Sequence, residues 1–130
     1  MTITMFLEIE SGATLGTIQH VVQNIANTVT VGKNSLEGYF SASNGFFYFE
    51  MLEPPSTVSA EGCMVDWLVG VMGAFHCPLH ELEQSWREIR HVMEELSLVS
   101  SARFVFSFQY DSVYALNEGH GVVYKKSMVV

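Results

Sequence analysis

His76, Cys77 and His80 form the densest group of side chains that could do chemistry, with Cys63 and Glu81 as further candidates. Zinc needs three or four nitrogen or sulfur ligands arranged around a tetrahedron. His76 and Cys77 are neighbours on a predicted strand, so they should point to opposite faces. Because no Cys-x-x-Cys pair supports them, we expect no metal and no cofactor, and a metal-dependent enzyme ranks third among the functions considered.

Cys77 is the one candidate nucleophile, since it precedes a predicted helix whose dipole would lower the pKa of its thiol. His80 is close enough in sequence to act as the base. The chain offers no recognisable third member of a triad and no oxyanion loop. A buried cysteine that fills space as a small apolar side chain explains the same position. We therefore expect that the protein is not an enzyme.

Carboxylates on the predicted helix that follows Cys77 suggest no acid–base pair. Glu83 and Arg87 have the i,i+4 spacing of an exposed ion pair. We interpret the charged residues of this helix as its solvated face, and they are Glu81, Glu83, Arg87, Glu88, Arg90, His91, Glu94 and Glu95.

Acidic residues are concentrated in the middle of the chain. The formal net charge is −8, and no Lys or Arg lies between Lys33 and Arg87. The acidic residues of that stretch are Glu37, Glu50, Glu53, Glu61, Asp66, Glu81 and Glu83. Nucleic acids and anionic membranes attract the opposite charge, so we expect neither as a partner. A basic protein is the partner that this charge favours.

Length and composition indicate one domain, residues 1–130, in the cytoplasm. Apolar residues make up 48% of the chain and charged residues 15%, which disfavours disorder. The mean hydropathy of +0.23 suggests apolar surface that faces a partner. We expect no secretory leader, because Glu8 and Glu10 interrupt the first apolar run, and no membrane span. Cys63 and Cys77, on one strand about 45 Å apart, should be reduced thiols.

Periodic apolar residues predict an α+β domain. We expect a mixed, mostly antiparallel sheet of about six strands, with two helices on one face and the other face open. The order strand, helix, strand, strand should occur twice. The predicted elements are a strand at 2–10, a helix from Thr14 to about Val29, a hairpin at 36–52, a strand at 63–77 bent at Gly70 and Gly73, a helix at 78–97, and strands at 102–110 and 121–128, with 113–116 ambiguous.

Asn44-Gly45 lies between two aromatic-rich runs, which is typical of a two-residue type I′ hairpin turn. With that turn, Phe40 pairs with Phe49 and Tyr39 pairs with Glu50. The register sorts the side chains into two faces. The inward set is Leu36, Phe40, Ala42, Phe47, Phe49 and Met51, and the outward set is Glu37, Tyr39, Ser41, Tyr48 and Glu50. In the later strand at 102–110, the even-numbered residues, including Tyr110, are expected inward.

The outward hairpin face is the candidate binding site. Tyrosine is enriched at protein interfaces, and carboxylates can match a basic partner. An ordinary solvated sheet face explains the same residues equally well, because aromatic residues favour strands. The candidate partner-binding residues are Glu37, Tyr39, Tyr48, Glu50, Glu53, Glu61 and Asp66.

The chain resembles bacterial immunity proteins, which neutralise a toxin delivered by contact-dependent inhibition or type VI secretion. The resemblance covers the whole chain in size, acidity and order of elements, with nearest residue-level support in the acidic run from Glu37 to Glu83 and in the pair Tyr39 and Glu50. It implies a non-catalytic cytoplasmic inhibitor that blocks a nuclease-like toxin through an acidic surface.

A second hypothesis is a small-molecule-binding module. The repeated order of elements also resembles paired-module ligand-binding domains, such as the effector-binding domains of some regulators. A cleft between the two halves would be lined by Trp67, Phe75, Phe106 and Tyr114. Paired-module metalloenzymes of the glyoxalase type have a similar length, but the first strand here carries no histidine.

Overall fold

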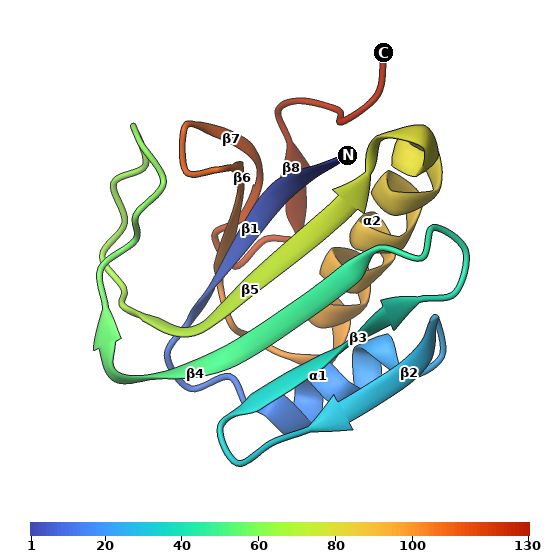
Figure 1. Ribbon diagram of the computed structural model, residues 1–130. Helices are drawn as coiled ribbons and strands as arrows, with labels where there is room; N and C mark the ends of the chain where they lie inside the picture. Colours follow the sequence, from blue (N-terminus) through green and yellow to red (C-terminus); the bar gives the residue numbers. More distant parts are fainter.

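The computed structural model describes all 130 residues, which form one sheet with two helices against one face (Figure 1). The strands are β1 (Thr2–Glu10), β2 (Ala26–Val31), β3 (Ser35–Phe40), β4 (Phe46–Ser56), β5 (Val69–Pro78), β6 (Phe104–Phe108), β7 (Ser112–Asn117) and β8 (Val122–Tyr124). The helices are α1 (Leu15–Val22) and α2 (Leu82–Val99), and a 3-10 turn (Leu79–Glu81) precedes α2. The predicted α+β class is confirmed, but the sheet has eight strands and not about six.

All neighbouring strands are antiparallel, in the order β2-β3-β4-β5-β1-β6-β7-β8. Each half of the chain contributes a strand, a helix and then three strands, one strand more than expected. After α1 the chain enters the sheet at its outer edge and works inward to β4. After α2 it enters beside β1 and works outward to β8. The halves therefore share an order of elements but not an arrangement.

The first helix is shorter than predicted. It was expected to reach about Val29, but it ends seven residues earlier, and the last four residues of the expected helix belong to strand β2. Thr14 caps α1 as predicted, and its Oγ1 accepts a hydrogen bond from the Thr17 backbone N–H at 3.2 Å. The helix ends at Val22. In residues 26–31 the last four, 28–31, are threonine or valine, and such β-branched residues suit a strand once β3 supplies hydrogen-bond partners.

The predicted strand at 63–77 begins only at Val69, and residues 57–68 form a loop. Gly70 is the bulge residue, because Ile9 pairs with Val71 whereas Glu10 pairs with Val69. A Cβ on Gly70 would lie 2.6 Å from the Cα of Ser11, so only glycine fits there. The two cysteines are thus not on one strand, although both thiols are free.

The hairpin register differs from the predicted one by an even number of residues. Tyr39 pairs with Phe46 and Leu36 with Phe49, and a five-residue loop at 41–45 replaces the two-residue turn. An even shift keeps every strand residue on its predicted face. Ala42, expected inward, lies in the loop and is exposed, and Met51 is half-buried.

A buried carboxylate on α2 explains the longer loop. Glu88 accepts hydrogen bonds from the backbone N–H groups of Ala42 and Ser43, at 2.9 and 3.1 Å. Glu88 is only 6% exposed, so its prediction as a solvated residue is wrong. Asn44 adopts a left-handed φ of 58°, a conformation that asparagine tolerates.

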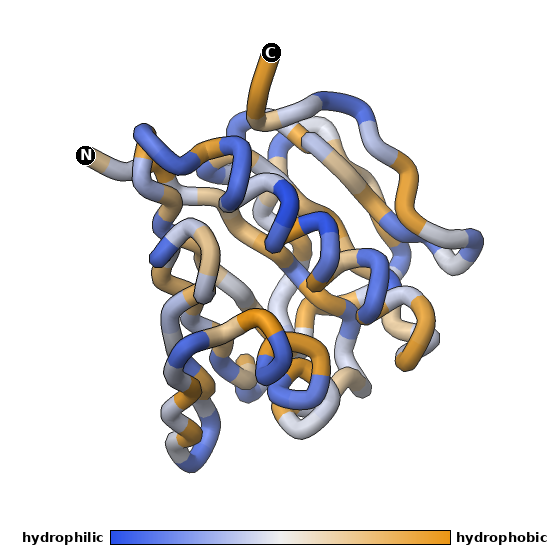
Figure 2. The backbone as a smooth tube through the Cα atoms, turned by 90° about the vertical axis from the view of Figure 1, so that its right-hand side faces the viewer, coloured by the Kyte–Doolittle hydropathy of each residue, from blue (hydrophilic) through white to orange (hydrophobic).

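The main core lies between the sheet and the helices and contains 23 buried residues. Figure 2 shows polar residues along the outer side of the helices and apolar residues in the strands behind them. A second, smaller cluster lies on the opposite sheet face, where the 57–68 loop packs on it, and its buried members are Ala60, Trp67, Val69 and Val105. Neither helix has both the length and the apolarity that crossing a bilayer requires.

Candidate functional site: the open sheet face

The helices leave one sheet face uncovered, and the 57–68 loop protects only one end of it. The rest of this face, carried by β3, β4, β5 and β1, is turned toward the viewer in Figure 1. Strand register places its side chains in rows. One row runs Tyr39, Phe46, His76, Thr4; the next runs Glu37, Tyr48, Ala74, Phe6; and the third runs Ser35, Glu50, Met72.

Aromatic rings dominate these rows. The Tyr39 and Phe46 ring centroids are 5.3 Å apart, and Phe46 stacks on His76 at 5.8 Å. Phe6 stacks on Tyr110 at 4.2 Å with the ring planes 7° apart. Tyr39 is 45% exposed. We call this surface the aromatic patch, and its members are Phe6, Tyr39, Phe46, Tyr48, Met72, Ala74, His76 and Tyr110.

Hydrogen bonds hold two patch side chains in place. The Thr4 Oγ1 lies 3.0 Å from the His76 Nδ1, and the Tyr110 hydroxyl donates to the Met72 Sδ at 3.6 Å. Gln109 and Tyr110 both have positive φ, and this turn brings the Tyr110 ring over Phe6. Tyr110 therefore lies on the open face, and its predicted inward orientation is wrong. Burial raises the pKa of its hydroxyl.

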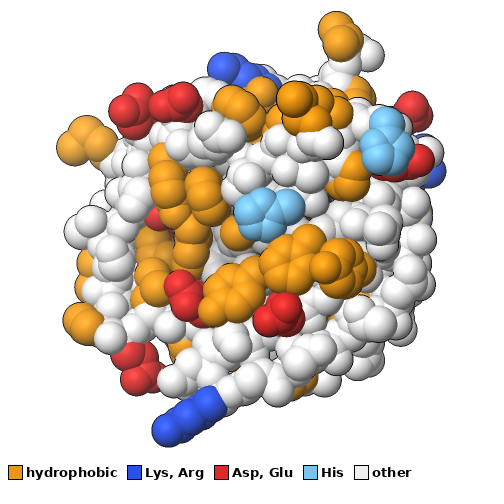
Figure 3. Space-filling view, in the orientation of Figure 1, with side chains coloured by type: hydrophobic (Ala, Val, Ile, Leu, Met, Phe, Trp, Pro, Cys, Tyr) orange, Lys and Arg blue, Asp and Glu red, His pale blue; other side chains and the backbone are white.

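Two carboxylates border the aromatic patch. Glu37 pairs across the strands with Tyr48, and the Tyr48 hydroxyl donates to Glu50 Oε2 at 3.2 Å. Burial, and then the Glu50 carboxylate, raises the pKa of Tyr48. Figure 3 shows apolar side chains gathered across this face beside acidic ones, with basic side chains only at the perimeter. The basic residues of the chain are Lys33, Arg87, Arg90, Arg103, Lys125 and Lys126.

Of the seven predicted partner-binding residues, the structure brings four together on this face: Glu37, Tyr39, Tyr48 and Glu50. Glu53 is exposed near the far end of β4. Glu61 and Asp66 lie on the 57–68 loop. Asp66 pairs with Arg103 at 3.1 Å, and Arg103 also binds Glu10 at 2.7 Å, so these two carboxylates are matched internally.

Of the aromatic patch, only Tyr39 and Tyr48 were predicted from the sequence. Alternation in β1 and β4 places Phe6 on the face of Glu8 and Phe46 on that of Tyr48, so these two residues could have been found. Strands β1 and β5 pair although they are far apart in the sequence, and no local sequence pattern predicts that pairing. Tyr110 reaches the patch through a turn with left-handed backbone conformation, which no local sequence motif predicts.

The 57–68 loop is anchored by Glu8, a β1 residue that is 3% exposed. Its carboxylate accepts hydrogen bonds from the backbone N–H groups of Ser59 and Ala60, at 2.7 and 3.1 Å. Burial raises the pKa of Glu8, and these two hydrogen bonds oppose the rise. The loop is therefore fixed against the sheet at its middle.

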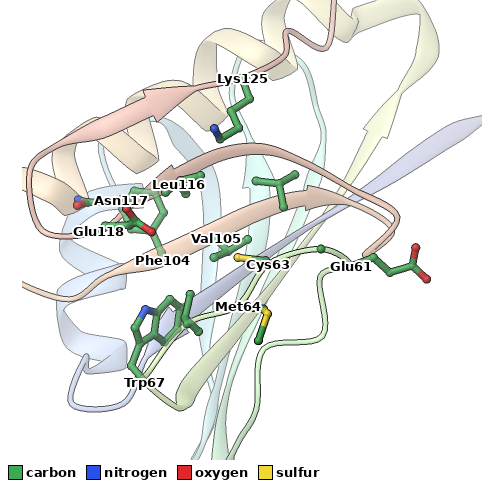
Figure 4. A pocket seen from close by; sticks show the side chains of 13 residues that line it. Glu61, Cys63, Met64, Trp67, Phe104, Val105, Leu116, Asn117, Glu118 and Lys125 are labelled. Carbon is green, nitrogen blue, oxygen red and sulfur yellow. The ribbon is translucent and has the colours of Figure 1, made fainter.

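A pocket of about 370 Å³ lies between this loop and the strands β6 and β7 (Figure 4). Cys63 and Trp67 line it from the loop, Val105 and Leu116 from the strands, and Lys125 from the segment after β8. The carboxylate of Glu61, at its border, points away from the hollow in Figure 4. Lys125 makes no ion pair, so its ammonium group remains available to a ligand.

The four aromatic residues predicted to line a cleft do not meet around one. Phe75 and Phe106 are fully buried in the main core, with ring centroids 6.2 Å apart. Trp67 belongs to the small cluster on the opposite face. Tyr114 packs against the main core.

The histidine and cysteine residues near the end of β5 also separate. His76 belongs to the open face and Cys77 to the core, and no group of three or more His, Cys, Asp or Glu residues is placed to hold a metal ion. Burial raises the pKa of Cys77 to about 11, so the lowered thiol pKa expected from a helix dipole is wrong. A thiol of this kind is a poor nucleophile at neutral pH.

No protein-family model matches the chain, and no curated protein or solved structure is similar enough to count as a match.

Proposed function

We propose that this chain is a non-catalytic binding protein that neutralises a basic protein partner, as an immunity protein blocks its cognate bacterial toxin in the cytoplasm. One observation carries the proposal: the uncovered sheet face holds an aromatic patch, bordered by Glu37 and Glu50, with no Lys or Arg within it. Aromatic side chains are enriched in protein interfaces, and tyrosine is among the residue types that contribute most to their binding energy.

The rigidity of the face supports a role in binding. The patch spans four hydrogen-bonded strands over a core of fully buried rings, and its aromatic members are each stacked on a neighbouring ring or hydrogen-bonded to a neighbouring side chain. A surface that is ordered before the partner arrives loses little conformational entropy on association. Interfaces of inhibitors are commonly preorganised in this way.

Charge supports a cationic partner. A nuclease holds phosphates with basic side chains, and carboxylates at Glu37 and Glu50 would occupy the same electrostatic position. Opposite charges across an interface speed association and suppress wrong partners. Glu10 and Asp66 are paired with Arg103, whereas the hairpin carboxylates Glu37 and Glu50 have no ion pair.

Co-expression with the product of the neighbouring gene tests this function, because immunity genes lie beside their toxin genes. We expect that the neighbour's product arrests growth when expressed alone and that this chain restores growth. Changing both Glu37 and Glu50 to Lys should abolish protection. Changing Glu83 to Lys, on an exposed turn of α2, should preserve it. A neighbour that is harmless, or protection that survives the double change, would contradict the proposal.

The pocket beside the 57–68 loop favours a second candidate function, a small-molecule-binding module. Its volume of about 370 Å³ lies within the range of ligand sites, and its lining combines apolar side chains with polar groups. Screening a library of small metabolites by thermal shift, with Val105→Trp as a variant that fills the hollow, tests this reading. Ligands that stabilise the native chain and not the variant would support it, and the lack of any such ligand would exclude it.

A further inference from the structure

We infer that the aromatic patch is a recognition site for arginine, with the guanidinium plane of a partner side chain seated over Ala74 between Tyr48 and Phe6. This inference rests on the proposed binding of a basic protein. It goes beyond that function by naming the cationic side chain that the surface selects.

Ala74 provides the floor of this seat. It occupies the centre of its row, and strand register places Tyr48 on one side of it and Phe6 on the other. Met72 and His76 flank it along β5. Each of these neighbours has a longer side chain than the single methyl group of Ala74. A flat group of three nitrogens around one carbon fits such a floor.

The walls of the seat are fixed. Phe6 is stacked against Tyr110, whose hydroxyl is bound to Met72, and His76 is held by Thr4 and stacked on Phe46. The Tyr48 hydroxyl is bound to Glu50. Ring faces that stay in place can accept a cation without first becoming ordered.

Two carboxylates complete the site. Glu37 is exposed, makes no hydrogen bond to another side chain and no ion pair, and lies directly across from Tyr48. Because Tyr48 lies between Glu37 and Ala74 in the row, Glu37 adds negative charge beside the seat and does not itself contact a guanidinium over Ala74. Glu50 accepts the Tyr48 hydroxyl with Oε2 and keeps Oε1 available. No internal cation competes for either group on this face.

This combination favours arginine over lysine. A guanidinium group is planar, stacks on aromatic faces and presents paired N–H groups that match a carboxylate, whereas an ammonium group is a compact and strongly hydrated point charge. Exposed cation–π contacts contribute about 0.5–1 kcal/mol, so an arginine that stacks on these rings where the strongly hydrated ammonium of lysine does not would bind about two- to fivefold more tightly.

Titration with three short peptides, followed by the backbone amide signals of the ¹⁵N-labelled protein in NMR, tests this inference. The peptides have the sequence Gly-X-Gly-X-Gly with blocked ends, where X is arginine, lysine or citrulline. Lysine has the positive charge but no planar end group, and citrulline has a planar end group but no charge. We expect the arginine peptide to shift the amides of β4 and β5 and to bind at least about two- to fivefold more tightly than the lysine peptide.

Two variants assign the selectivity. Tyr48→Leu should make arginine and lysine bind equally, and Glu37→Gln should weaken both, while the unshifted signals of the helices report that the fold is intact. Equal binding of the two cationic peptides to the native chain would overturn the arginine inference and leave the basic partner in place. Shifts confined to other surfaces would overturn the seat at Ala74, whereas the co-expression experiment alone decides the proposed function.

Discussion

Glu8 and Glu88 each stabilise a loop in the same way: Glu8 binds the 57–68 loop and Glu88 binds the 41–45 loop. Each carboxylate is buried and accepts hydrogen bonds from two consecutive backbone N–H groups of a loop that is distant in sequence. Buried charges are costly unless they are hydrogen-bonded in this way. The contacts join residues more than 40 positions apart, so a reading of local patterns could not find them.

Glu8 and Glu10 should respond to pH in opposite directions. Burial raises the pKa of Glu8 above 4.5, so the folded state holds this proton more tightly than the unfolded state does. The contribution of Glu8 to the free energy of unfolding therefore falls as pH rises from 4.5 through the raised pKa. Arg103 lowers the pKa of Glu10, so the contribution of Glu10 is present above pH 4.5 and is lost as pH falls.

Urea unfolding of Glu8→Gln and Glu10→Gln between pH 3 and pH 7 measures these contributions. The stability of the native chain relative to Glu8→Gln should decrease with rising pH, and its stability relative to Glu10→Gln should increase. If the first difference also increases, the two loop N–H bonds outweigh burial, and Glu8 is held as a carboxylate whose pKa is not raised.

At the scale of elements, the faces of the hairpin could be predicted although its register could not. Side chains alternate with a period of two, so Phe47 and Phe49 face inward under any even shift. Turn chemistry pointed to Asn44-Gly45, but Glu88 on α2 stabilises a longer loop. Tertiary contacts also determine the structure of residues 26–31. These residues continue an apolar pattern of period three or four, which predicts a helix, but they form a strand that pairs with β3.

The contact between β4 and β5 makes Gly73 a size-sensitive position of the sheet core. A Cβ there would lie 2.5 Å from the Phe49 ring, which is fully buried and cannot swing away. Gly73→Ala should therefore destabilise the protein by about 1–3 kcal/mol, as overpacking does in other cores.

The matched control is Gly16→Ala in α1, where the nearest atom to the new Cβ would be the Thr14 Oγ1 at 3.8 Å. This change should stabilise the helix by up to about 1 kcal/mol, since alanine is the better helix former. Thermal unfolding of both variants gives the comparison. A Gly73→Ala variant as stable as the native chain would mean that Phe49 has room that the packing does not show.

At the scale of the whole molecule, the sheet divides the protein into a helical side and an open side. The α+β class, the two helices and the antiparallel sheet follow from apolar periodicity. The order of strands does not, because β1 and β5 meet through pairings some 70 residues apart that leave no local pattern. The acidic stretch of the sequence is likewise divided by the fold: Glu37 and Glu50 remain together, whereas Asp66 is paired with Arg103.

The proposed binding side accounts for the composition of the chain as a whole. Apolar residues exceed the needs of the core because several aromatic side chains lie on the open face. The hairpin carboxylates Glu37 and Glu50 form no ion pair with a Lys or Arg of this chain. A protein that served no partner on this side would be expected to place mixed charges there.

The proposed interface on the open sheet face is tested most sharply by binding to the neighbouring gene's product. The dissociation constant is measured for the native protein, Glu50→Lys and Glu83→Lys, each at two salt concentrations. Glu83→Lys should unfold at nearly the same urea concentration as the native protein, because exposed changes rarely alter stability by more than about 0.5 kcal/mol. Glu50→Lys, at a half-buried position, should lose only about 1 kcal/mol, because it removes the hydrogen bond from Tyr48. Glu50→Lys should bind at least about tenfold more weakly, with slower association and a smaller effect of salt, and Glu83→Lys should bind as the native protein does. Unchanged binding by Glu50→Lys together with weakened binding by Glu83→Lys would place the interface on the helical side and contradict the account.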